Sequence, residues 1–199
     1  MNQLKVWNKI APKWSEYKKE PPGMVIDFLK NKKGNILDLG CGSGRNFVET
    51  KGTIYGVDFS DEMIKLAEKK SKQDNIKTNL FVAKATKLPF KDNFFDSVIC
   101  IALIHCMKYK FQRKKTIKEL YRIMKPKAQM LITVWDKDAR RFKKEKKKMK
   151  VSWNVNGKKL YRNYYLYDYE EFKSELENVG FKITKHFDPC SNIILIVEK

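Results

Sequence analysis

The sequence predicts an α/β fold in which a mostly parallel seven-stranded sheet ends in a C-terminal antiparallel hairpin. Apolar, strand-like runs alternate with helical patterns between residues 35 and 134. Because parallel strands need long crossovers, this alternation indicates five parallel strands with helices on both faces. Only DPCS, residues 188–191, separates the last two strand-like runs. Such a short connection predicts that these two strands pair antiparallel.

Apolar spacing and turn residues place the individual elements. Helices are expected over Leu4–Lys13 and Met24–Leu29, with YKKEPPG between them. Asp61 is expected to cap a later helix. The predicted strands are Asn35–Leu39, Thr53–Asp58, Asn79–Ala83, Phe95–Ala102, Ala128–Val134, Phe181–Phe187 and Asn192–Glu198. The predicted helices associated with the sheet lie near Arg45–Glu49, Asp61–Lys70, Phe111–Met124 and Tyr169–Val179.

The bulk composition restricts the class of protein. A length of 199 residues suits one well-buried domain, and no apolar stretch approaches the roughly 20 residues that span a bilayer. The first residues lack the apolar core of a secretory signal, so we expect a soluble, cytoplasmic protein with no membrane partner. The four cysteines form no CxxC pair, which favours reduced thiols and no metal site.

The charge balance is unusual. Lys and Arg total 43 against 23 Asp and Glu, a net charge of +20. Such an excess favours polyanionic partners, with nucleic acid first and an anionic membrane second. Compositional drift is the alternative, but drift alone is expected to enrich acidic residues as well.

A glycine-rich turn follows the first predicted strand. Asp38 ends the strand, and Gly40, Gly42 and Gly44 follow in the pattern G-x-G-x-G. Asp58 lies twenty residues after Asp38, at the end of the second strand, where an acid can accept hydrogen bonds from ribose hydroxyls. A dinucleotide site has the spacing G-x-G-x-x-G instead, and no GxxxxGK[ST] loop is present.

Four motifs in order resemble those of class I, S-adenosylmethionine-dependent methyltransferases. They are LDLGCGSGRN, YGVDFSDEMIKLAEKK, LPFKDNFFDSVICIALIH and IKELYRIMKPKAQMLITVW. The resemblance implies the Rossmann-like fold of that family and S-adenosylmethionine as cofactor. It also implies that Asp58 holds the ribose and that Phe59 flanks the adenine. The residues implied to line the methionine part are Asp38, Gly40, Gly42, Gly44, Ile101 and Ala102.

One position departs from this family pattern. The family usually has an acid after the third strand that accepts a hydrogen bond from the adenine amino group, and here Lys84 stands in its place. A protonated lysine has no acceptor. Adenine is then expected to be held by the backbone at Ala85, by apolar contacts or by another acid.

Further segments resemble the tRNA methyltransferases that esterify 5-carboxymethyluridine at the anticodon wobble position. They are VWNKIAPKW and PPGMVIDFL near the start, then IALIHC, TVWDKD and YRNYYLYDYEEF. The resemblance implies catalytic roles for His105 and Arg162, the latter orienting a substrate carboxylate with its planar fork. The implied substrate-binding residues are Lys18, Trp135, Tyr161 and Tyr164, the tyrosines by stacking on an unpaired base.

The segment KDARRFKKEKKKMK, residues 137–150, carries nine basic and two acidic residues. It is expected either to contact tRNA phosphates or to form a solvated loop. The basic residues proposed for phosphate contact are Arg140, Arg141, Lys143 and Lys144.

The resemblance also implies a protein partner. Relatives of this family work with a small zinc-binding activator subunit, which is expected to pair with the exposed sheet edge at Asn79–Ala85. The single domain, 1–199, would then comprise N-terminal helices (1–34), a cofactor-binding core (35–135), the basic segment (137–150) and substrate-side elements with the terminal hairpin (151–199).

Two other functions stay open at this level. One is a class I methyltransferase acting on a small acid or a quinone-like molecule, which would have no use for the positive charge. The other is a non-catalytic tRNA-binding or scaffold subunit, for which the replacement of the adenine-binding acid by Lys84 is the best support.

Overall fold

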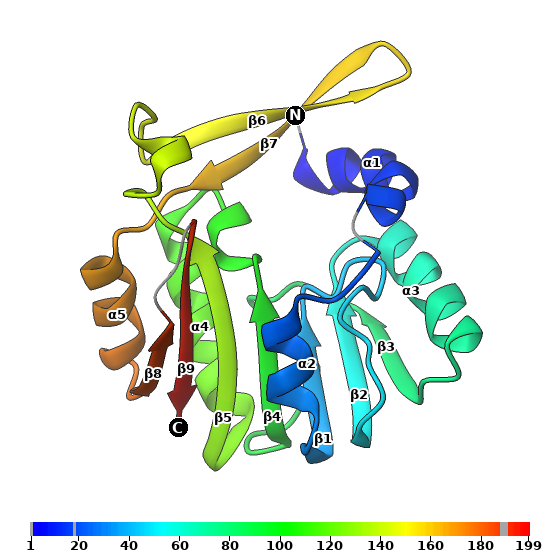
Figure 1. Cartoon of the computed structure of the whole chain (residues 1–199), viewed down its shortest axis with the longest axis vertical. Coiled ribbons are helices and arrows are strands. Elements are labelled where there is room, and N and C mark those ends of the chain that lie inside the picture. The colour runs from blue at the N-terminus through cyan, green and yellow to red at the C-terminus, as the bar shows by residue number, and fades with distance from the viewer. Residues whose placement is uncertain (1, 18, 188–190) are drawn as a thin grey trace.

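The computed structural model describes residues 2–17, 19–187 and 191–199. Its main sheet has the strand order β3-β2-β1-β4-β5-β9-β8 (Figure 1). The first five strands in sequence run parallel, and β9 pairs antiparallel with both β5 and β8. The strands are β1 (Lys33–Leu39), β2 (Lys51–Asp58), β3 (Thr78–Val82), β4 (Phe95–Ile101), β5 (Met124–Trp135), β8 (Lys182–Phe187) and β9 (Asn192–Glu198).

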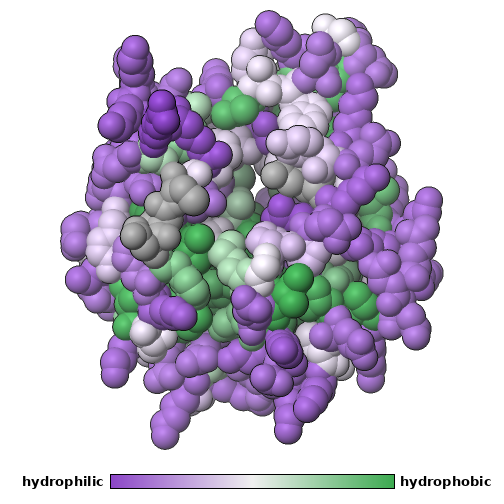
Figure 2. Space-filling model, in the orientation of Figure 1, coloured by the Kyte–Doolittle hydropathy of each residue, from purple (hydrophilic) through white to green (hydrophobic). Residues whose placement is uncertain are grey.

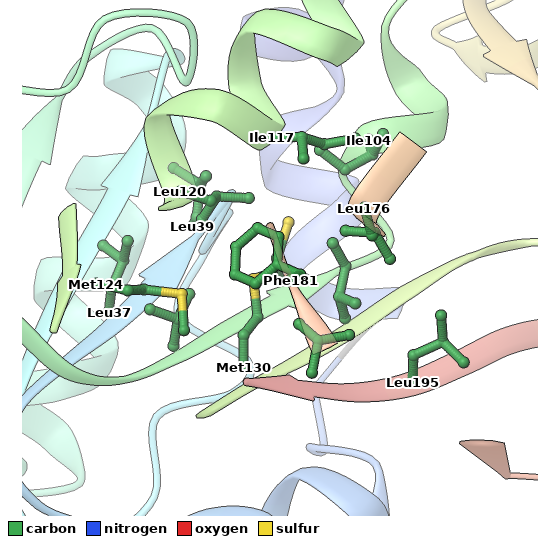
Figure 3. Close-up of a cluster of buried hydrophobic side chains, with 14 of the residues drawn as sticks. Leu37, Leu39, Ile104, Ile117, Leu120, Met124, Met130, Leu176, Phe181 and Leu195 are labelled. Atoms are coloured by element: carbon green, nitrogen blue, oxygen red, sulfur yellow. The ribbon is translucent and has the colours of Figure 1, made fainter. Parts of the chain in front are cut away.

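Helices cover both faces of this sheet because successive strand residues point to opposite sides. Ile36 packs against α2, whereas Leu37 packs with α4 and α5 on the other face. Figure 3 shows the latter cluster, in which Leu37 and Leu39 of β1 lie near Leu120 and Met124. The helices are α1 (Gln3–Tyr17), α2 (Gly23–Leu29), α3 (Asp61–Gln73), α4 (Lys110–Ile123) and α5 (Tyr169–Glu177), with 3-10 turns η1 (Ile104–Cys106) and η2 (Arg140–Phe142).

A second, two-stranded sheet lies above the carboxyl ends of the parallel strands (Figure 1). It is the antiparallel hairpin of β6 (Lys148–Val155) and β7 (Lys158–Tyr165). Asn156 and Gly157 join the strands with φ angles of 49° and 79°, the positive values that a tight hairpin turn of this type requires. Leu160 and Trp153 of the hairpin pack on Val6 and Ile10 of α1.

The predicted α/β fold, with its parallel strands and closing hairpin, is confirmed, but two local predictions are wrong. No helix forms near Arg45–Glu49, because only the residues from 40 to 50 separate β1 from β2, and residues 40–47 turn tightly instead. Asp61 does not cap α3. The cap is Ser60, whose hydroxyl accepts a hydrogen bond from the Met63 N–H over 3.2 Å.

The Asp61 side chain instead holds α1 in place. Asn8 of α1 donates from its side-chain amide to the Asp61 carboxylate over 2.7 Å, and it accepts from the Ser60 hydroxyl over 2.6 Å. The start of α3 is therefore tied to α1.

Hydrophilic side chains cover much of the face in Figure 2, and the surface is hollowed below the hairpin. Within the described residues, every helix is too short or too polar to cross a membrane.

Candidate functional site

A cavity of about 980 Å³ is lined by residues at the carboxyl ends of β1, β2 and β4 and by residues of α1 and the hairpin. Its volume is within the range of small-molecule and cofactor sites. In an open parallel sheet, this end of the strands is where ligands bind. Nine of the residues singled out in the sequence line it: Gly40, Gly42, Asp58, Phe59, Lys84, Ala85, Ile101, Ala102 and Tyr161.

The glycine turn brings bare backbone to the cavity. Gly40 has a φ of 76°, and a Cβ atom there would lie 2.9 Å from Cδ1 of Leu103. Gly44 has a φ of 81°, and a Cβ atom there would lie 2.7 Å from the Phe47 ring. Side chains at these two positions would therefore be strained and would clash. Gly44 packs below the turn and does not line the cavity.

Asp58 is fixed by two backbone donors. Its Oδ2 accepts a hydrogen bond from the Gly42 N–H over 3.1 Å, and its Oδ1 accepts from the Ser60 N–H over 2.9 Å. Burial raises the pKa of this carboxyl to about 6, although the hydrogen bonds from Ser60 and Gly42 favour the ionised form. Each oxygen keeps a second acceptor site, which suits the two hydroxyls of a ribose.

Asp38 lies beneath the turn, 1% exposed. Its Oδ2 accepts from the Asn46 side-chain amide over 3.4 Å, and its Oδ1 has no hydrogen-bond partner among the described residues. Burial raises the pKa of this carboxyl to about 7, while nearby Arg45 lowers it. Asp38 itself does not line the cavity, although Leu39 and Gly40, which follow it, do. A buried acceptor without a partner next to lining residues suits a ligand that carries donors or positive charge, as S-adenosylmethionine does. Its contact with the methionine part stays a prediction.

The end of β4 forms another wall of the cavity. Ala102 follows the strand with a φ of 58°, a left-handed conformation that is rare for a residue with a Cβ atom. Its N–H donates to Oγ1 of Thr133 on β5 over 3.0 Å. This turn places Ile101, Ala102 and Leu103 against the cavity. Sequence analysis had assigned the first two to the methionine part of the cofactor, and that assignment stays a prediction.

Lys84 and Ala85 also line the cavity, in the loop after β3. The preceding residue is tied to the site, because the Ala83 N–H donates to the Asp58 carbonyl over 2.9 Å. Lys84 is exposed. The structure thus places both residues beside Asp58, as expected of residues near the adenine, and their contacts with it stay a prediction.

His105 does not line the cavity, contrary to its expected catalytic contact. It is 1% exposed, and burial lowers its pKa to about 3. Its Nδ1 accepts a hydrogen bond from the Trp135 N–H over 3.2 Å. Its ring packs against the rings of both Trp135 and Tyr164, at centroid distances of 5.0 and 5.5 Å. His105 is therefore a neutral acceptor that braces the end of β4 against β5 and the hairpin.

Trp135 and Tyr164 were expected to contact substrate, but they stack on each other inside the wall. Their ring centroids lie 4.2 Å apart at an interplanar angle of 7°, and Tyr164 is 4% exposed. Neither residue lines the cavity. Their position supports the wall and does not offer a ring to a ligand.

Arg162 lies in an aromatic cage, and it does not line the cavity. It is 4% exposed, and its guanidinium carbon lies 5.1 Å from the ring centroids of Trp14 and Trp153. Its Nη1 donates to the Tyr164 hydroxyl over 2.8 Å, and its Nε has no hydrogen-bond partner among the described residues. This placement corrects the expected direct contact between Arg162 and a substrate carboxylate.

The hairpin supplies lining residues that the sequence analysis missed. Lys150 of β6 and Asn163 of β7 face each other in the hairpin register, and both line the cavity. The loop after η1 adds Lys108 and Tyr109. Alternating polar and apolar residues on either side of Asn156-Gly157 predict a hairpin and could have revealed the first pair.

Apart from its last residue, Lys150, the basic segment lies outside the cavity. Its Arg141 guanidinium carbon stacks 4.5 Å from the Phe142 ring centroid and 4.9 Å from that of Trp135. Arg140, Lys143 and Lys144 are exposed. The expected contact between these residues and tRNA stays a prediction, and Lys18 lies outside the described residues.

Comparisons with known proteins agree with this geometry. Residues 37–132 match the model of the methyltransferase domain family. A tRNA (carboxymethyluridine(34)-5-O)-methyltransferase from Arabidopsis thaliana is 34% identical over 134 residues, which are 66% of this chain and 32% of the relative. The enzyme of the same name from Saccharomyces cerevisiae is 35% identical over 135 residues, which are 66% of this chain and 47% of the relative. The chain thus spans about a third to a half of the length of these relatives.

The fold has counterparts among solved structures. A complex between the Trm112 methyltransferase activator of Haloferax volcanii and a methyltransferase contains a chain that superposes with a TM-score of 0.72. That match covers 100% of this chain and 98% of the other, at 14% identity. Together with the glycine turn, Asp58 and the strand order, these matches show that residues 37–132 resemble the methyltransferase domain family and that the chain has the class I, S-adenosylmethionine-dependent methyltransferase fold.

Proposed function

We propose that the chain binds S-adenosylmethionine in the cavity and transfers its methyl group to the carboxylate of 5-carboxymethyluridine, or a related uridine, at the tRNA wobble position. The observation that carries this proposal is the placement of Asp58 beside the glycine turn in a cavity whose other charged lining residues, within the described ranges, are basic. The names of the relatives from Arabidopsis thaliana and Saccharomyces cerevisiae support the substrate.

The cofactor roles follow from the floor of the cavity. Asp58 accepts hydrogen bonds from the ribose hydroxyls, and Phe59 lies next to it for the adenine. The methionine part lies along the bare backbone of Gly40 and Gly42, near the buried carboxyl of Asp38. Burial raises the pKa values of Asp38 and Asp58. A cationic ligand nearby would lower these pKa values again, because an opposite charge favours the ionised form of a carboxyl.

The charge of the remaining wall suits an anionic substrate. Arg45, Lys84, Lys108 and Lys150 line the cavity, and Asp58 is the lone acid among its described lining residues. Lys150 lies on β6 of the hairpin, and the hairpin lies above the carboxyl ends of the parallel strands (Figure 1). We assign the substrate carboxylate to the hairpin side, where Lys150 and Asn163 replace the contact first expected from Arg162.

The chemistry needs little from the protein beyond alignment. Bound S-adenosylmethionine supplies an activated methyl group on a sulfonium. A carboxylate is ionised at neutral pH, so its oxygen can attack that carbon while the carbon–sulfur bond breaks, and no proton has to move. The chain's part is to hold the two groups in line and to exclude water, and the reaction requires no general base.

His105 and Arg162 act in this proposal as positioning residues. His105 holds the backbone of Trp135, and Arg162 holds Tyr164 and the tryptophans of α1 and the hairpin. These contacts fix the wall that carries Lys150 and Asn163. They explain why the two residues can belong to the site without touching a ligand.

Two measurements test the proposal. Calorimetry with S-adenosylmethionine, with and without a Trm112-type activator, should show binding, and absence of binding in both would contradict any enzymatic role. Transfer of a labelled methyl group should then occur to tRNA that carries 5-carboxymethyluridine and not to tRNA that lacks it. Salt-insensitive transfer to a small carboxylic acid alone would instead indicate the small-molecule alternative.

The free edge of β3 is the proposed binding site for an activator subunit that binds zinc. β3 ends the strand order of the main sheet. The Lys77 carbonyl accepts from the Ile54 N–H, and the Ala83 N–H donates to the Asp58 carbonyl. The backbone groups of the odd-numbered residues of this strand therefore form hydrogen bonds with β2. In a parallel ladder the alternate residues, here Thr78, Leu80 and Val82, then present their backbone groups outward. The Haloferax volcanii complex supports such a partner.

A pair of variants tests this edge. Phe81 is unsuitable, because its ring packs 5.1 Å from that of Phe90 inside the aromatic cluster. Val82→Pro removes an outward N–H donor, whereas Val82→Ala keeps it and removes only side-chain atoms. We expect co-purification with a Trm112-type protein to be lost in the first variant and kept in the second. Equal retention by both would contradict edge pairing.

A further inference from the structure

Two exposed aromatic rings stand at the rim of the cavity. Tyr109, the N-cap residue of α4, is 50% exposed, and Phe111 in the first turn is 66% exposed. Their rings stack at a centroid distance of 5.7 Å and an interplanar angle of 21°. Tyr109 lines the cavity and Phe111 does not. The pair therefore extends the cavity wall onto the outer surface.

The surroundings of this pair are basic. Residues 107–118 contain no acid, and α4 has no acidic residue in its first turn. The Lys108 Nζ lies 4.9 Å from the Tyr109 ring centroid. The exposed lysines of this stretch are Lys108, Lys110, Lys114, Lys115 and Lys118. The amides at the start of α4 add a partial positive charge.

Flat rings interleaved with cations match the chemistry of unpaired nucleotides. Bases in a loop can be splayed out and stacked on aromatic side chains while lysines contact the phosphates. A duplex keeps its bases stacked on one another and cannot use such rings. A protein partner that covers two aromatic rings would also have to neutralise five lysines. Charge therefore favours RNA.

We propose that Tyr109 and Phe111 form a stacking platform for an unpaired anticodon-loop base that flanks the modified uridine. This inference rests on the proposed function for the identity of the RNA. With the wobble base in the cavity, the neighbouring nucleotide reaches the rim, where Tyr109 borders the opening. Tyr161, 45% exposed on the hairpin, lines the same cavity and offers a third ring.

The platform is tested at Phe111, which lies outside the cavity. Phe111→Leu keeps an apolar side chain but removes the ring, and Phe111→Trp keeps a ring. Binding of the full chain to a fluorescent anticodon stem-loop is compared with binding to a blunt RNA duplex of the same length at fixed salt. We expect Phe111→Leu to weaken loop binding by roughly five- to 150-fold. Phe111→Trp should bind the loop like the wild type, and duplex binding should not change.

Other outcomes overturn the inference. Wild-type loop affinity in Phe111→Leu would show that stacking contributes nothing, and loss of a Trm112-type protein instead would identify a protein interface. An equal loss for loop and duplex would indicate a general electrostatic or folding effect, which cofactor affinity and thermal unfolding of the variant check. The proposed function fails separately, if wild-type protein transfers no methyl group to tRNA while the loop preference still depends on Phe111.

Discussion

The backbone N–H of Gly42 donates a 3.1 Å hydrogen bond to Oδ2 of Asp58. This bond joins the glycine turn after β1 to the end of β2, so the two features that the sequence singled out separately form one unit. It leaves Asp58 oriented before any ligand binds. Preorganised acceptors lose less free energy on binding than mobile ones.

Asp58→Ala should weaken S-adenosylmethionine binding by roughly 10- to 150-fold, because hydrogen bonds to a charged acceptor contribute about 1.5–3 kcal/mol. Asp58→Asn retains an acceptor oxygen and should lose less. Calorimetry measures both affinities. If alanine at this position left the affinity unchanged, the cofactor would have to lie elsewhere in the cavity.

Cofactor affinity should rise with pH between about pH 5 and pH 7.5. Burial raises the pKa of Asp58 to about 6 and that of Asp38 to about 7, and the ionised forms accept the ligand's donors. Calorimetry across this range tests the trend, with Asp58→Asn as a control whose pH dependence should be smaller. A flat profile for the wild type would contradict the assignment of these carboxyls to the site.

Without ligand, the same two carboxyls should make the stability of the fold decrease as pH rises, whereas cofactor affinity increases. Their folded pKa values lie above the unfolded value of 3.8, so the folded chain holds more protons between about pH 4 and pH 7. Their contribution to the free energy of unfolding therefore falls as pH rises through this window. Urea unfolding of the wild type and of Asp38→Asn measures it, and the variant should show the weaker decline.

His105→Phe should destabilise the protein near pH 7.5 by about 1–3 kcal/mol, because the ring stack is kept but the Trp135 N–H loses its acceptor. Burial lowers the pKa of His105 to about 3, so the wild type loses stability as pH falls below the unfolded value of 6.5. The difference between wild type and variant should shrink by roughly 2 kcal/mol at pH 5. A constant difference would show that the pKa of His105 is the same in the folded and the unfolded chain, and so is not lowered by burial.

Arg162→Ala should lower stability by roughly 2–4 kcal/mol, because it empties the cage and leaves the Tyr164 hydroxyl without its donor. Arg162→Met fills most of that volume without a buried charge, so it should unfold at or above the wild-type temperature. Methyl transfer should survive in the methionine variant. Its loss, with folding and cofactor affinity intact, would return Arg162 to direct substrate contact.

Arg140, Lys143 and Lys144 should contribute to RNA affinity through phosphates alone. Replacing all three by glutamine should weaken binding to loop and duplex equally, and it should reduce the slope of log affinity against log salt by about 2 to 3. Fluorescence anisotropy at several salt concentrations gives the slope. An unchanged slope would leave this segment as a solvated loop.

The sequence predicted the sheet and the floor of the cavity because both depend on local pattern. Period-two apolar runs define the strands, and the end of a parallel strand is a ligand position wherever it occurs in the chain. Gly40, Gly42 and Asp58 thus fell where expected. The prediction of a helix after the turn was wrong because the connection between β1 and β2 is too short to contain it. The helix propensity of single residues does not take the length of a connection into account.

The roof of the cavity was harder to predict because it depends on tertiary packing. His105 lies in η1, shortly after β4 on the ligand side of the sheet, yet the β6–β7 hairpin covers it. Arg162 sits among tyrosines in sequence, and tryptophans from α1 and β6 enclose it in space. A sequence motif can indicate the role of a residue, but it does not indicate which other side chains will pack over that residue. Recognising the Asn156-Gly157 hairpin was the missing step.

The most direct test of the account is mass spectrometry of nucleosides from tRNA incubated with the purified protein, a Trm112-type activator and isotopically labelled S-adenosylmethionine. The account predicts that the label appears in the methyl ester of 5-carboxymethyluridine, or of a closely related uridine, and in no other nucleoside. It also predicts that the label is lost with Asp58→Ala. Binding of the cofactor without any labelled nucleoside, or a label on a base ring or ribose, would contradict it.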